Sequence, residues 1–171
     1  SLTSSTSHID GTTEEGSSQS RFLPTTNHFD IDNEKNGITQ EIRFSSEFEG
    51  ALQTLVGVFY EDFESIENLD MNAVIGMPGG TTGIFDILGL TTKREFTQLA
   101  LFGEVYYTVT DVLQLTAGAR FFDYDRTDEQ IGSGYADSVA PADIDESSET
   151  FKFVADYRMS EDWLVYGSWA Q

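Results

Sequence analysis

The sequence predicts an all-β fold whose antiparallel strands follow one another up and down along the chain. Several long segments alternate between apolar and polar side chains, as in LQLTAGARFF at residues 113–122. A strand places successive side chains on opposite faces, so each such segment has one apolar and one mostly polar face. Gly, Ser, Thr, Phe and Tyr are abundant, whereas proline is rare. This composition also favours strands, and amphipathic helical periodicity is hard to find.

Seven segments are predicted as strands, the first of which alternates only weakly. They are residues 1–10, 38–46, 51–63, 96–111, 113–127, 150–159 and 163–171. Several run to about ten residues or more, against a mean of roughly 5–6 in soluble domains. A tilted strand that crosses a bilayer needs about 9–11 residues, so the lengths favour membrane-spanning strands.

The connections between these segments alternate strictly between long and short. The short ones are SEFEG, the residues around Thr110–Val112, and SED; the long ones, predicted as polar loops, are residues 11–37, 64–94 and 128–149. Soluble meanders have no reason to place every long loop at one end. Transmembrane β-barrels have short turns on one side and long loops on the other. Aromatic residues near the strand ends, such as Tyr60, Tyr107 and Trp163, also suit the girdles of such barrels.

The two faces of the predicted strands are assigned to two different surroundings. The apolar faces are expected to contact lipid, and their residues include Leu99, Leu101, Val105, Leu113, Leu115 and Phe121. Charged side chains on the other faces would be costly in a dry core unless paired, but they can meet water in a barrel lumen. This expected lumen-facing set is Arg43, Glu104, Arg120, Lys152, Asp156 and Arg158.

Charge and composition exclude several classes of function. The formal net charge is -21 and the sequence pI is about 4.1, so the chain cannot neutralise the phosphates of a nucleic acid. The chain has no cysteine, which excludes disulfides and thiolate metal sites. No apolar run approaches the roughly 20 residues of a membrane-spanning helix. The first ten residues contain no signal-peptide pattern, so an exported protein would have lost its beginning.

No motif predicts an enzyme, and we expect no catalytic residue, no resident metal and no cofactor. His8 and His28 are each followed two residues later by an aspartate, but we interpret these residues as solvated loop residues rather than metal ligands. G-x-S-x-G, H-E-x-x-H and P-loop sequences are absent. The glycine-rich GMPGGTTG at residues 76–83 is predicted as a loop tip, and its flanks NAVI and IFDILGL as a short helix or strand.

Carboxylates crowd two of the predicted loops. One group lies at residues 61–70 and the other at residues 123–146. Calcium binding, or bridging to lipopolysaccharide phosphates through divalent ions, would use such hard oxygen ligands. No EF-hand spacing is present, and we favour a solvated acidic surface.

Three stretches resemble the barrel domain of TonB-dependent outer-membrane receptors. ITQEIRFSSEFEGALQTLVGVFYEDFE resembles a hairpin that usually begins F-T-Q-E-[IL]-R-L-x-S and ends W-x-x-G-x-[FY]-Y-x-x-E. ALFGEVYYTVTDVLQLTAGARFFDYDRT resembles the hairpin A-x-F-G-E-x-x-Y-x-x-[ST]-D-x-L-x-L-T-x-G-x-R, and DYRMSEDWLVYGSWAQ resembles the one after it. The likeness covers most of residues 36–171 in the same order, with Leu55 where the family often has Trp. It is specific for the family and not for a substrate.

The resemblance implies a barrel of about 22 strands that is filled by an N-terminal plug. Residues 1–171 would be a partial barrel domain of about seven middle strands, without the plug, the TonB-contacting box or the remaining strands. Its first and last strands would be bare edges that invite aggregation, so this chain alone should transport nothing.

The resemblance also implies a function and partners. The whole receptor would take up a scarce nutrient across the outer membrane of a Gram-negative bacterium, most commonly a ferric siderophore or another iron complex. Its partners would be outer-membrane lipid, the iron chelate, and the TonB-ExbB-ExbD complex acting through the missing plug. Tyr124 and Arg126 are the candidates for ligand contact at the barrel mouth. Two alternatives stay open: a soluble or secreted acidic β-sheet protein that binds carbohydrate or a protein partner, and a small complete porin-like barrel.

Overall fold

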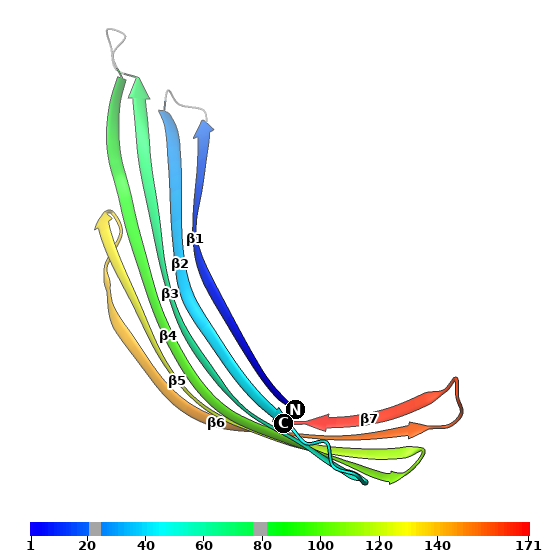
Figure 1. Ribbon diagram of the computed structural model, residues 1–171. Coiled ribbons are helices and arrows are strands. Elements are labelled where there is room, and N and C mark those ends of the chain that lie inside the picture. Colours follow the sequence, from blue (N-terminus) through cyan, green and yellow to red (C-terminus); the bar gives the residue numbers. More distant parts are fainter. Residues whose placement is uncertain (21–24, 77–81) are drawn as a thin grey trace.

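The computed structural model describes residues 1–20, 25–76 and 82–171, which form a single antiparallel sheet. The strands follow chain order across the sheet (Figure 1). They are β1 (Leu2–Ser20), β2 (Thr25–Ser45), β3 (Leu52–Gly76), β4 (Thr82–Thr110), β5 (Leu113–Gly134), β6 (Val139–Arg158) and β7 (Leu164–Ala170). The predicted all-β, up-and-down, seven-stranded arrangement is therefore confirmed.

The sheet is long and strongly curved, and its short turns lie at one end (Figure 1). Within the described residues, β1 and β7 form no contact with each other, so the seven strands do not close into a barrel. Each of the two outer strands therefore has one unpaired edge. Bare edges of this kind pair readily with further strands.

No helix in the described part of the chain is long and apolar enough to cross a membrane.

The three predicted long loops are wrong for most of the described residues, because these stretches continue the strands; residues 135–138 of the third are a connection without strand structure. Pairing runs as far as Ser20 with Thr26, Gly76 with Thr82 and Gln130 with Val139. Ladder hydrogen bonds join main-chain groups, so polar residues pair as well as apolar ones once the neighbouring strand is in register. We call these paired extensions the hairpin arms: residues 11–20 with 25–37, residues 64–76 with 82–94, and residues 128–134 with 139–149.

The glycine-rich segment at residues 76–83 was predicted as a loop tip. Its residues 77–81 lie outside the described residues. The flanks NAVI and IFDILGL were predicted as either helix or strand, and both are strand, in β3 and β4 respectively.

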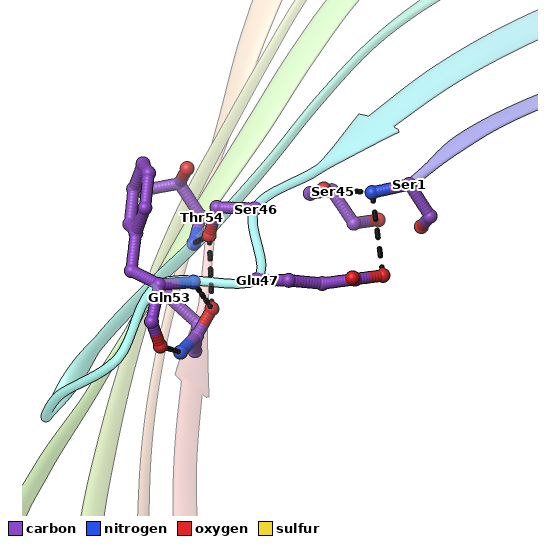
Figure 2. A network of polar contacts seen from close by, with 7 residues as sticks. Ser1, Ser45, Ser46, Glu47, Gln53 and Thr54 are labelled. Carbon is purple, nitrogen blue, oxygen red and sulfur yellow. Dashed lines mark hydrogen bonds and ion pairs between the residues drawn. The ribbon is translucent and has the colours of Figure 1, made fainter.

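The three short connections are confirmed, and the β2–β3 turn is held by side chains. Gln53 donates a hydrogen bond to the carbonyl of Phe48 (2.7 Å) and accepts one from the hydroxyl of Ser46 (3.0 Å). Figure 2 shows the Gln53 side chain lying beside Ser46, whose hydroxyl also accepts a hydrogen bond from the Thr54 amide (2.7 Å). Gly50 in this turn has a φ of 144°, which favours glycine.

The sheet forms a single layer with almost no buried core. Of the described residues, Ala73 and Ala100 are the buried hydrophobic ones, with 6% and 1% of their surfaces exposed. Large apolar side chains stand exposed instead, among them Leu101 at 58% and Phe153 at 54%. A surface of this kind requires a covering that is itself apolar.

Candidate functional site

One face of the sheet collects the apolar side chains at the short-turn end. Residues opposite each other in a ladder lie on the same face, and Leu101 lies opposite Phe121 while Val105 lies opposite Ala117. All six residues predicted to contact lipid share this face. We call the apolar residues of this face the apolar band. Its members are Leu52, Val56, Val58, Tyr60, Leu99, Leu101, Val105, Tyr107, Leu113, Leu115, Ala117, Phe121, Phe151, Phe153, Ala155, Tyr157, Val165 and Trp169.

The apolar band has defined limits along the strands. On β4 it runs from Leu99 to Tyr107, close to the 9–11 or so residues with which a tilted strand crosses a bilayer. Tyr107 and Tyr157 lie at its short-turn end. At the other end the same face becomes acidic, because Asp123 lies opposite Leu99 and Asp62 follows Tyr60 on β3.

The opposite face carries the charged side chains at the same level, and we call it the polar face. All six residues predicted to face a lumen lie on it: Arg43, Glu104, Arg120, Lys152, Asp156 and Arg158. The alternation seen in the sequence therefore separates the two predicted sets onto opposite faces of the sheet. Whether these faces contact lipid and water stays a prediction.

Ion pairs on the polar face join residues both between strands and along one strand. The Lys152 ammonium lies 2.7 Å from the Glu104 carboxylate, although β5 lies between their strands. The Tyr106 hydroxyl donates a hydrogen bond of 2.5 Å to the same carboxylate. The Arg43 guanidinium forms an ion pair with Glu41 on its own strand. Pairing of this kind offsets the cost of removing charged side chains from water.

Aromatic rings lie beneath two arginines of the polar face. The Arg43 guanidinium is 5.9 Å from the Phe102 ring centre, and that of Arg120 is 5.3 Å from the Phe59 ring centre. Both distances are within the reach of cation–π attraction. The Phe102 ring covers Gly57, where a Cβ atom would lie only 2.4 Å from it. Sequence reasoning missed Phe59, Phe102 and Gly57, although a glycine inside a strand signals a close approach.

A second cluster lies on the polar face where β4, β5 and β6 continue beyond the apolar band into the hairpin arms. Arg94 and Arg126 both contact the Asp128 carboxylate, at 2.9 Å and 2.5 Å. Two cations thus share one carboxylate. The hydrogen bond from Arg126, together with Arg94, lowers the pKa of Asp128 below its usual value. Of the predicted ligand contacts, Arg126 belongs to this group and Tyr124 lies beside it on β5.

Tyr124 lies in an aromatic group next to the two arginines. Its ring centre is 5.8 Å from that of Phe96 and 6.4 Å from that of Phe122. Its hydroxyl donates a hydrogen bond of 2.5 Å to Glu146, and this bond raises the pKa of the phenol. We call Arg94, Phe96, Phe122, Tyr124, Arg126 and Asp128 the mouth cluster. Sequence reasoning named Tyr124 and Arg126. It missed Arg94 and Phe96, which only the pairing of β4 with β5 brings to them, and also Phe122 and Asp128, which lie on the same face of β5.

The histidine and aspartate pairs are not brought together. His8 lies opposite Ile38, whereas His28 lies far along the β1–β2 arm, where its ring nitrogen is 2.7 Å from the Ser18 hydroxyl. Within the part of the chain that the structure describes, no group of three or more His, Cys, Asp or Glu side chains is placed to hold a metal ion.

A single sheet with an apolar band on one face and paired charges on the other has the make-up of a β-barrel wall. The model of the family described as "TonB dependent receptor-like, beta-barrel" matches residues 1–171. The chain belongs to this family, as its motifs predicted. No curated protein sequence matches the chain.

Solved structures of two iron-uptake proteins are among those that resemble this sheet. One is the ferric yersiniabactin uptake receptor FyuA from Yersinia pestis, with a TM-score of 0.70 and 17% identity over 83% of this chain and 21% of FyuA. The other is the unliganded ferric citrate transporter FecA, with a TM-score of 0.70 and 12% identity over 99% of this chain and 24% of FecA. These likenesses show the fold. The chain spans about a quarter or less of the length of either structure.

Proposed function

We propose that residues 1–171 form part of the barrel wall of an outer-membrane receptor that takes up an iron complex, such as a ferric siderophore, with energy from TonB. The observation that carries the proposal is that the same stretch of the strands bears apolar side chains on one face of the sheet and charged side chains on the other. Membership of the TonB-dependent receptor family supports it. FyuA and FecA, whose folds are similar, are by their names an uptake receptor for ferric yersiniabactin and a ferric citrate transporter.

The apolar band argues against a soluble acidic β-protein. Leu99, Leu101 and Phe121 are each more than half exposed. Soluble monomers rarely expose contiguous apolar patches of more than a few hundred Å², and this band continues across neighbouring strands. Hydrocarbon covers such a surface without any demand for hydrogen bonds. The unpaired edges of β1 and β7 would be occupied by further strands of the barrel.

The polar face would line a water-filled lumen that also holds the plug. A passive barrel performs no covalent chemistry, so its wall acts by shape, charge and binding. The ion pair of Glu104 with Lys152 keeps both charges partnered at membrane depth. The inner-membrane TonB-ExbB-ExbD complex would supply energy through the plug.

The mouth cluster is the part of this chain that best suits an anionic iron chelate. The chain as a whole is strongly acidic and would repel such a ligand. At the mouth cluster, however, Arg94 and Arg126 supply two cations, beside the carboxylates of Asp128 and of Glu146, which accepts the hydrogen bond from Tyr124. Aromatic rings beside them offer an apolar contact surface, as Tyr124 does. Arginine and aromatic side chains together are the residue types that bind most strongly at interfaces.

Uptake of radioactive iron tests the proposal. The complete receptor that contains this chain is expressed in a bacterial strain without its own iron receptors, and several ferric chelates are offered one at a time. We expect accumulation of iron from at least one chelate, and loss of that accumulation when TonB is deleted. The receptor should fractionate with the outer membrane. Correct insertion without uptake of any iron chelate would reject the substrate class, and a water-soluble product would reject the barrel.

A further inference from the structure

The apolar band is not smooth: it contains a groove near the short-turn end of β5, β6 and β7. The floor consists of three small residues on neighbouring strands, Ala117, Ala155 and Gly167. The cavity volume is about 610 Å³. This lies within the roughly 300–1,000 Å³ range of small-molecule sites, although the groove opens to the outside along its length.

Large apolar side chains form the two walls of the groove. Phe153 and Trp169 lie opposite each other on β6 and β7, with ring centres 5.6 Å apart and planes tilted by 32°. Tyr107 and Leu115, which lie opposite each other on β4 and β5, form the other side. The small side chains continue these two rows across the sheet: Ala155 and Gly167 follow Leu115, and Ala117 lies opposite Phe153, so each row of large side chains ends beside a low surface.

The space above the floor is open. A Cβ atom added at Gly167 would meet no other atom within 4 Å. No charged side chain lines the groove. A molecule in the groove therefore needs no charged or ionic partner group, and an apolar molecule fits its lining.

We propose that this groove holds one acyl chain of a phospholipid, from the leaflet at the short-turn side of the membrane. This inference rests on the proposed function, because it needs the apolar band to face a bilayer. In a bilayer the hydrophobic effect does not favour one apolar partner over another, so van der Waals packing decides what fills a groove. An empty groove forfeits the dispersion contacts of its lining atoms. A flexible hydrocarbon chain recovers them.

The position of the groove identifies the leaflet. Tyr107, on its wall, is also a residue of the short-turn end of the apolar band, and Tyr157 lies at the same end. Amphipathic aromatic side chains lie at membrane–water interfaces. In transmembrane barrels the short turns are periplasmic. A chain in this groove therefore reaches a headgroup on the periplasmic side.

Photo-crosslinking tests the proposal in the complete receptor. The receptor is reconstituted in vesicles that contain phosphatidylethanolamine with a diazirine along one acyl chain, and adducts are mapped by peptide mass spectrometry after illumination. We expect adducts at Phe153 and Trp169 to exceed those at Leu52 and Val56, which line no groove and are similarly exposed, severalfold. All four residues belong to the apolar band, so simple contact with lipid would label them alike.

Two variants fill the groove and one matched variant does not. Gly167→Leu places a side chain in the open space, and Ala155→Leu does so on the adjacent strand. Ala119→Leu adds similar bulk to the same face outside the groove lining. We expect severalfold loss of adducts at Trp169 in either filled variant, with adducts at Val56 unchanged, and no loss in the Ala119→Leu control.

The outcomes separate this proposal from the proposed function. Equal labelling across the apolar band, or labelling of Trp169 that survives both filling substitutions, overturns the acyl-chain site and leaves the barrel wall intact. Absence of adducts from all four residues overturns both, because the band would then not face lipid.

Discussion

Lys152 and Glu104 form an ion pair of 2.7 Å across the backbone of Gly118, which lies directly opposite each of them on the strand between. A Cβ atom at Gly118 would lie 3.1 Å from carbon atoms of Lys152 and 3.2 Å from one of Glu104. The missing side chain therefore creates the space in which the two long side chains meet. Three strands of the polar face are joined at this point.

Replacing Gly118 should uncouple this ion pair. In Gly118→Leu the new side chain displaces both partners, and the crowding should cost about 1–3 kcal/mol of unfolding free energy. A double-mutant cycle with Glu104→Gln and Lys152→Met, measured by denaturant unfolding of the complete receptor in vesicles, should give a coupling of about 1 kcal/mol with glycine present. The coupling should vanish with leucine. Equal coupling in both backgrounds would show that Gly118 does not govern the contact.

A positive charge on the apolar band should destabilise the barrel according to depth. Leu101→Lys places an ammonium near the middle of the band and should cost about 2–4 kcal/mol. Thr97→Lys lies on the same face of the same strand beyond the band, and there the cost should be about 0–1 kcal/mol. The same vesicle unfolding assay measures both. Similar small costs at the two sites would mean that the band does not face lipid.

Removing the mouth cluster side chains should weaken ligand capture. The double variant Tyr124→Ala, Arg126→Ala should raise the Kd for the transported iron chelate about tenfold or more, because such side chains dominate binding energies. Binding is measured by quenching of tryptophan fluorescence, and uptake by radioactive iron. Thr97→Ala, on the other face nearby, is the control. Unchanged Kd and uptake in the double variant would remove these two residues from the ligand site.

The contribution of Asp128 should disappear in acid. Arg126 and Arg94 lower the pKa of this carboxyl below its usual value of 3.8, so the folded state favours the ionised form. The stabilisation is fully present above pH 3.8 or so and is lost as the pH falls through the lowered pKa. These exposed side chains are screened by water, so it should not exceed about 1 kcal/mol. Unfolding of the wild type and of Asp128→Asn between pH 7 and 2 should give curves that converge in acid; a constant difference would contradict this assignment.

The strand pattern within the apolar band could be predicted from the sequence because its apolar and polar side chains alternate with a period of two. Leu113, Leu115 and Phe121 alternate with Gln114, Thr116 and Arg120, and the structure places the two sets on opposite faces. The hairpin arms carry no such period. Apart from the apolar flanks NAVI and IFDILGL, they bear polar and acidic residues on both faces, and no regular alternation distinguished a paired strand from a loop.

The mouth cluster and the glycine-centred contacts could not be predicted because they depend on cross-strand register. Arg94 and Asp128 are 34 residues apart in the chain and meet only because they lie opposite each other in the β4–β5 ladder. The glycines were visible as interruptions of the strand pattern. Which side chains would occupy the space above them required the register of both neighbours.

A barrel wall requires one face of β4 to meet lipid and the other to meet water. Single-cysteine variants at each position from Gln98 to Tyr107 test this requirement in the complete receptor, since this chain has no cysteine of its own. Each variant is spin-labelled in bilayers, and its collisions with oxygen and with a water-soluble nickel complex are measured. We predict a period of two, with oxygen favoured at Leu99, Leu101 and Val105 and nickel favoured at Gln98, Phe102 and Glu104. Equal access of the nickel complex to both faces would contradict the barrel wall.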